Sequence, residues 1–159
     1  MKTETNIKSA FSQHAYSYFE FLNAAKRAEN SNPGISKLFK SLAESEKIVA
    51  QNLFVLISGE TDFEQNIMNG IDDLTYQTTQ FYPTVINQAE MDASAREAAM
   101  FRATEKVGKN LTALLKNALD NPYRNTPFHI CGICGNVTME LPNTCTVCSS
   151  TSDKFIRIE

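Results

Sequence analysis

The four cysteines of the chain all lie near its C-terminal end, where they form two Cys-x-x-Cys pairs. The pairs are Cys131/Cys134 and Cys145/Cys148, and ten residues separate them. Two such turns bring four thiolates to the corners of a tetrahedron around one metal ion, with metal–sulfur distances of about 2.3 Å. Iron and zinc both accept this arrangement, so the spacing leaves both metals open. Disulfides would need an oxidising compartment, and nothing in the sequence indicates export.

Length and charge limit the classes of function that need to be considered. A chain of 159 residues can form one medium-sized domain and a small second one. With 15 basic and 18 acidic side chains the net charge is −3, which gives no electrostatic reason to expect a nucleic-acid or membrane partner. The polar N-terminus lacks the apolar run of a signal peptide, and no apolar stretch is long enough to span a membrane. We therefore expect a cytoplasmic protein.

Apolar residues recur every three or four positions over residues 6–119, in four stretches that predict helices. The first stretch covers about residues 6–29. Asn32 before Pro33 is typical of a helix start, and Ser58-Gly59 ends the second helix. Four long helices with short connections predict a bundle around one shared apolar core.

The sequence signals for the ends of the third and fourth helices are weaker. Thr61 with Glu64 has the form of a capping box that opens the third helix. Pro83 lies inside that helix and lacks a backbone donor, so the helix must kink there or consist of two pieces. Asp92 or Ser94 is expected to cap the fourth helix.

The C-terminal part has a different pattern. Residues 121–127 contain two prolines and no periodicity, which predicts a linker between a helical domain of residues 1–120 and a metal domain of residues 128–159. Short alternating segments in the metal domain predict three strands: 128–130, 137–139 and 155–158. So small a β module is expected to need its metal in order to fold well.

One polar side chain interrupts the apolar stripe of each helix near its middle: His14, Glu46, Gln77 and Glu105. A buried carboxylate needs a proton, a partner or a metal. We favour a hydrogen-bonded cluster of the imidazole and the two carboxylates. The alternative is a single divalent metal with Gln77 as a weak fourth ligand. A third interpretation is that the apolar stripes are misassigned by one residue, so that some of these groups are exposed to solvent. His129, in the strand before Cys131, is expected to be a partly exposed structural residue.

Several segments together carry a resemblance to a known family: residues 6–11, 38–46, 66–76, 81–83, 131–135 and 145–148. Over nearly its whole length the chain resembles rubrerythrins, which combine a ferritin-like four-helix bundle with a C-terminal rubredoxin-like domain. The resemblance implies a mainly α fold, a homodimer, an electron-transfer partner protein and a role in oxidative stress. It also implies iron in the four-cysteine site and a di-iron centre in the bundle that reduces hydrogen peroxide.

Most di-iron ligands of that family are absent from this chain. Of seven ligand positions only Glu46 and Glu105 keep the family residue. The remaining positions replace glutamate or histidine by other residues: His14, Val49, Leu74, Gln77 and Gly108. Because two irons need about four carboxylates, we expect no di-iron centre.

Three functions follow from this pattern. The favoured one is electron transfer by an iron ion held in the four-cysteine site, with the peroxidase site of the bundle lost. The second is an oxidoreductase that reduces peroxide at a residual metal site of His14, Glu46 and Glu105. The third is a protein-interaction module that is stabilised by zinc and has no redox role. Catalytic residues cannot be assigned from the sequence.

Overall fold

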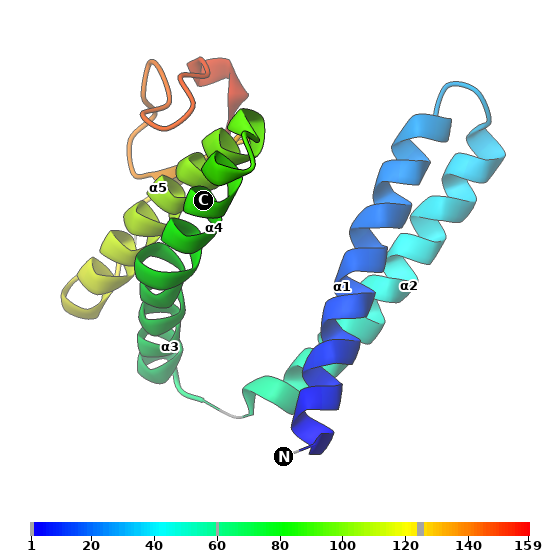
Figure 1. The fold of residues 1–159 in the computed structure, drawn as a ribbon, viewed down its shortest axis with the longest axis horizontal. Coiled ribbons are helices and arrows are strands. Elements are labelled where there is room, and N and C mark those ends of the chain that lie inside the picture. Colours follow the sequence, from blue (N-terminus) through cyan, green and yellow to red (C-terminus); the bar gives the residue numbers. More distant parts are fainter. Residues whose placement is uncertain (1, 60, 124–125) are drawn as a thin grey trace. The chain divides into compact units, whose positions relative to one another are not determined.

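The computed structural model describes residues 2–59, 61–123 and 126–159 (Figure 1). The chain divides into two units, Met1–Thr61 and Asp62–Glu159. The first unit is a pair of helices, and the second contains the remaining helices and a small sheet. In the part of the chain that is described, no helix is both long and apolar enough to cross a membrane.

The first unit is a hairpin of α1 (Lys2–Ala28) and α2 (Pro33–Ser58), which Figure 1 shows side by side. The cap predicted for α2 is confirmed, because Asn32 Oδ1 accepts a hydrogen bond from the Ile35 amide at 3.1 Å. The predicted end is confirmed as well. Gly59 follows the helix with a φ of +63°, a conformation that glycine adopts without strain.

Small side chains let α1 and α2 approach each other closely. The buried apolar residues of the hairpin are all alanines: Ala25, Ala43 and Ala50. Ser36 is also buried, and its hydroxyl donates to the Ala25 carbonyl at 2.9 Å, which satisfies a polar group between the helices. Phe21 and Phe39 stack beside this seam with ring centroids 6.1 Å apart. The larger apolar side chains therefore lie along the edges of the seam.

The helices of the second unit are α3 (Phe63–Tyr76), the π-helical turn η1 (Gln77–Phe81), α4 (Tyr82–Met91) and α5 (Ala95–Asp120). The cap predicted at Thr61 is wrong by one residue. Asp62 occupies that position and its carboxylate accepts from the Gln65 amide at 2.8 Å. An aspartate at this place also interacts favourably with the positive end of the helix dipole. Ser94 precedes α5 as predicted.

Pro83 divides the third predicted helix, and the division takes a form that the sequence does not specify. The five-residue turn η1 precedes α4, and the Tyr82 amide donates to the Gln77 carbonyl five residues earlier. Pro83 thus falls in the first turn of α4, where its missing N–H group costs little. The widened turn also shifts the faces of α3 and α4 relative to a continuous helix.

The three predicted strands form one antiparallel sheet: β1 (Phe128–Cys131), β2 (Val137–Thr138) and β3 (Phe155–Ile158), preceded by the 3₁₀ turn η2 (Ser152–Lys154). Their order is β2-β1-β3, with Cys131 opposite Phe155 and Ile130 opposite Val137. Cys131, Cys145 and Asn136 are the most buried side chains of this module. Its centre therefore consists of thiol and amide groups.

The mainly α fold class with a small β module is confirmed. The predicted linker lies between the end of α5 and the start of β1, and its residues 124 and 125 are outside the described residues. The division into a bundle of residues 1–120 and a metal domain of residues 128–159 stays a prediction.

Candidate metal centre

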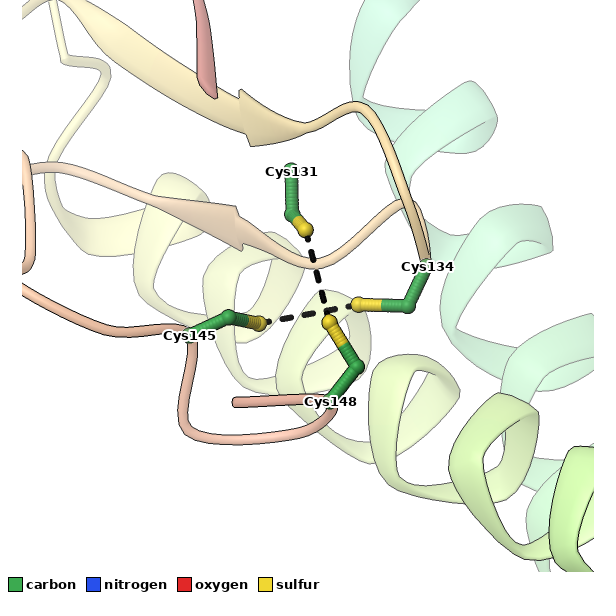
Figure 2. Close-up of side chains that lie close together, drawn as sticks. All are labelled: Cys131, Cys134, Cys145 and Cys148. Atoms are coloured by element: carbon green, nitrogen blue, oxygen red, sulfur yellow. Dashed lines mark hydrogen bonds between the residues drawn. The ribbon is translucent and has the colours of Figure 1, made fainter. Parts of the chain in front are cut away.

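The four cysteine side chains converge on one point, as the sequence predicted. Figure 2 shows their sulfurs directed toward one another from two turns of the β module. The Sγ atoms of Cys131 and Cys148 are 3.6 Å apart, as are those of Cys134 and Cys145, and all four lie within 4.8 Å of one another. A tetrahedron with metal–sulfur bonds of 2.3 Å has edges of about 3.8 Å. The four free thiols therefore fit a single tetrahedral metal ion.

The two turns share one backbone geometry. In the first, the Gly135 amide donates to the Cys131 carbonyl at 2.8 Å, and in the second the Ser149 amide donates to Cys145 at 2.9 Å. Both amides belong to residues with positive φ, +78° at Gly135 and +61° at Ser149. Serine is strained in this region by about 1 kcal/mol. The second turn keeps the required shape despite the strain.

The electrostatic surroundings of the thiols differ. Burial raises the pKa of Cys134 to about 12. Burial also acts to raise the pKa of Cys131, but hydrogen bonds from the Ser150 hydroxyl and from backbone amides outweigh it and lower the pKa to about 6. The same hydroxyl and the Ser150 amide lower the pKa of Cys148. Metals bind the thiolate form, which the lowered pKa values of Cys131 and Cys148 favour.

Two asparagines connect the metal module to α5, and sequence reasoning missed both. Asn136 is completely buried directly after the first turn, and its Oδ1 accepts a hydrogen bond from Asn110 Nδ2 on α5 at 2.7 Å. The Asn136 carbonyl also accepts from the Cys131 amide at 2.8 Å. Asn136 is thus hydrogen-bonded both to β1, which carries Cys131, and to α5. An asparagine two residues after Cys134 was the only available signal.

His129 lies half-buried in β1, between Thr138 of β2 and Arg157 of β3. This position agrees with the prediction that His129 is a partly exposed structural residue.

The four polar residues predicted within the bundle are divided between the two units of the chain. In the first unit His14 Nδ1 lies 2.6 Å from Glu46 Oε2, so the predicted hydrogen bond between them is present. In the second unit Glu105 accepts from Lys109 Nζ at 2.7 Å. Gln77 is half-buried at the start of η1. A single metal site that joins all four predicted residues stays a prediction.

A threonine fills the space beside Gly108. A Cβ atom at Gly108 would lie only 2.7 Å from Thr78 Cγ2 and 4.0 Å from Leu74 Cδ2. Thr78 is buried in η1, and its hydroxyl donates to the Leu74 carbonyl at 2.8 Å. The glycine therefore accommodates the methyl group of Thr78 at the point where the family resemblance would place a histidine.

The chain is similar to known proteins over nearly its whole length, which includes both the helices and the four-cysteine module. No family model matches the chain. Its sequence is 26% identical to rubrerythrin-2 of Clostridium acetobutylicum over 94% of this chain and 92% of that protein. It is 24% identical to nigerythrin of Nitratidesulfovibrio vulgaris over 96% of this chain and 85% of that protein.

Solved structures of nigerythrin have a similar fold. A fully reduced, all-ferrous nigerythrin superimposes with a TM-score of 0.59 and 21% identity, and a mixed-valence form with 0.54 and 24%. Each match covers 98% of this chain and 86% of the other. The helical part followed by the four-cysteine β module therefore has a ferritin-like and rubredoxin-like organisation. The chain is a homologue of rubrerythrin-2 and nigerythrin, which confirms the family resemblance of its sequence.

Proposed function

We propose that this rubrerythrin-like metal-binding protein transfers electrons through an iron ion held by Cys131, Cys134, Cys145 and Cys148, and that it has lost the di-iron peroxidase centre. The convergence of four thiols at sulfur–sulfur distances of 3.6 Å is the observation that carries the first part. Iron in such a site exchanges one electron while its four ligands stay in place. The resemblance to an all-ferrous nigerythrin supports iron over zinc.

The packing around Gly108 supports the second part of the proposal. Thr78 and Leu74 occupy the side of α5 where the family resemblance would place a ligand, and no metal-binding group extends from Gly108 itself. Glu105 is directed to Lys109, which neutralises its charge without a metal. Apolar and hydroxyl-bearing side chains therefore stand where a carboxylate-rich site would need ligands.

Metal analysis of the purified protein tests both parts. We expect about one iron per chain, with the red colour of ferric iron bound by four thiolates. Replacing Cys145 by alanine should remove this iron, while a Glu46→Ala variant should keep all of it. Three irons per chain together with rapid peroxide turnover would contradict the proposal. A colourless protein with one zinc would instead favour the interaction module.

The His14–Glu46 pair supports a second candidate, reduction of peroxide at a residual metal site that includes Glu105. A carboxylate and an imidazole 2.6 Å apart are suitable ligands for one divalent metal. Glu46→Ala should then abolish both a second bound metal and peroxide turnover. Turnover that survives this substitution would exclude the candidate.

We also propose a homodimer that receives its electrons from a partner protein, as the family resemblance implies. Light scattering on the iron-loaded protein tests the first point, and a monomer at micromolar concentration would contradict it. Cytoplasmic location stays a prediction.

A further inference from the structure

We infer that the hydroxyl of Ser150 donates a hydrogen bond to the Cys131 sulfur of the four-cysteine centre and raises the reduction potential of that centre, an inference that rests on the proposed iron-dependent function. Ser150 Oγ lies 3.1 Å from Cys131 Sγ and 3.3 Å from Cys148 Sγ. Those cysteines belong to different turns. One side chain therefore contacts both halves of the site.

The backbone holds this hydroxyl in position. The Ser150 carbonyl accepts a hydrogen bond from the Cys145 amide at 2.8 Å, the counterpart of the contact between Asn136 and Cys131 in the first turn. The residue is also half-buried, which limits the access of water to the contact. The position of Oγ near the sulfurs thus follows from the fold of the second turn.

The direction of the hydrogen bond follows from the chemistry of the ligands. A thiolate bound to a metal has no proton, so only the serine can donate. Its single proton is directed to Cys131 Sγ, because the contact with Cys131 suits a serine donor and the contact with Cys148 does not. Backbone amides also donate to the sulfurs, but no substitution removes them cleanly. Ser150 is a side-chain donor that can be deleted.

The effect on the potential follows from charge. Four thiolates give the site a net charge of −1 with ferric iron and −2 with ferrous iron. A donor directed at sulfur stabilises the more negative state more strongly, so it favours reduction. Ser150 is thus a positioning and tuning residue rather than a ligand.

The test uses the full chain, reconstituted with ferrous iron without oxygen and then titrated optically for its reduction potential. Ser150→Ala should disfavour the reduced state by up to about tenfold, which is about 59 mV for a one-electron couple. The sulfur-to-iron charge-transfer band of the ferric form should move to lower energy, because the sulfur electrons lose stabilisation. Thr151→Ala is the matched control and should leave both values unchanged, because the Thr151 hydroxyl is exposed and donates to Asp153 instead of a sulfur.

A second pair of variants separates the hydroxyl from the shape of the residue. Ser150→Thr keeps the hydroxyl and should retain the wild-type reduction potential. Ser150→Val has nearly the same shape as the threonine variant but no hydroxyl, so its reduction potential should match that of Ser150→Ala. This pair remains informative if the alanine variant does not fold.

The outcomes distinguish the inference from the proposed function. Iron that binds normally with an unchanged potential and charge-transfer band in Ser150→Ala and Ser150→Val overturns the inference alone. An equal shift in Thr151→Ala also overturns it. Failure of the wild-type chain to bind iron overturns the proposed function and the inference together.

Discussion

The metal module and the helices differ in how many of the metal-binding residues expected from the family resemblance they contain. In the module all four ligands are present, and their sulfurs already have the spacing of a tetrahedral site. Along the helices five of the seven positions that the family uses for di-iron ligands carry other residues. The module is built from two short turns, whereas a bundle site needs one side chain from each of several helices. The proposed loss of the di-iron centre would then be a case in which a site made by local sequence persists while a site made by distant residues is replaced.

The largest predicted effect concerns the ligands themselves. Cys145→Ala should abolish iron binding, because Cys145 is one of two almost completely buried cysteines and alanine supplies no donor in its place. Since structural metals supply about 10 kcal/mol or more to modules of this kind, β1 to β3 should unfold as well. Iron content and amide hydrogen exchange measure the two effects. A Cys145→Ala variant that keeps one iron per chain would contradict the assignment of the iron to the four-cysteine module.

Removal of the metal from the wild-type chain should separate the two regions in one experiment. A chelator that strips the iron should leave the helical circular dichroism nearly unchanged, while amides of β1 to β3 lose protection from exchange. Helices that melt together with the module would show that the metal also stabilises the bundle. Return of protection on addition of iron is the control for irreversible damage.

The packing at Gly108 gives a smaller effect. Gly108→Ala should destabilise the chain by about 1–2 kcal/mol despite the better helix propensity of alanine, because the new Cβ meets Thr78 Cγ2 at 2.7 Å. Thr78 is β-branched and buried, so it cannot easily turn aside. The free energy of unfolding from denaturant titration measures the change.

The matched background for this prediction is Thr78→Ser, which removes the methyl group and keeps the hydroxyl bond to Leu74. Gly108→Ala in that background should become neutral or stabilising by up to about 1 kcal/mol. The same destabilisation in both backgrounds would show that Thr78 does not fill the space. A cycle of the four proteins isolates the contact.

The smallest effect is expected at the helix caps. Asp62→Ala should cost about 1 kcal/mol, because its carboxylate accepts from the Gln65 amide at 2.8 Å. Ser94→Ala should cost only a few tenths of this, because the Ser94 side chain makes no capping hydrogen bond to α5. Thermal or chemical unfolding of the two variants measures the difference. Equal costs would contradict the assignment of Asp62 as the cap.

The features that the sequence predicts correctly are those with short-range causes. The cysteine spacing predicts the metal site because each pair closes a single turn. Asn32 before Pro33 predicts a helix start for the same reason, and Pro83 predicts a break because it lacks a backbone donor. The cap at Thr61 was wrong by one residue, since Thr61 and Asp62 are both suitable caps and only the backbone conformation selects between them.

Contacts between distant residues were decided by the tertiary structure alone. The turn η1 shifts the helix faces and brings Thr78 against Gly108, thirty residues further along the chain. Ser150 reaches Cys131, and Asn110 reaches Asn136, across the packing of separate elements. Sequence periodicity specifies which face of a helix is apolar but not the partner that a side chain meets. Thus the convergence of the four cysteines could be predicted from the sequence, whereas the groups that form hydrogen bonds with them could be identified only once the chain was folded.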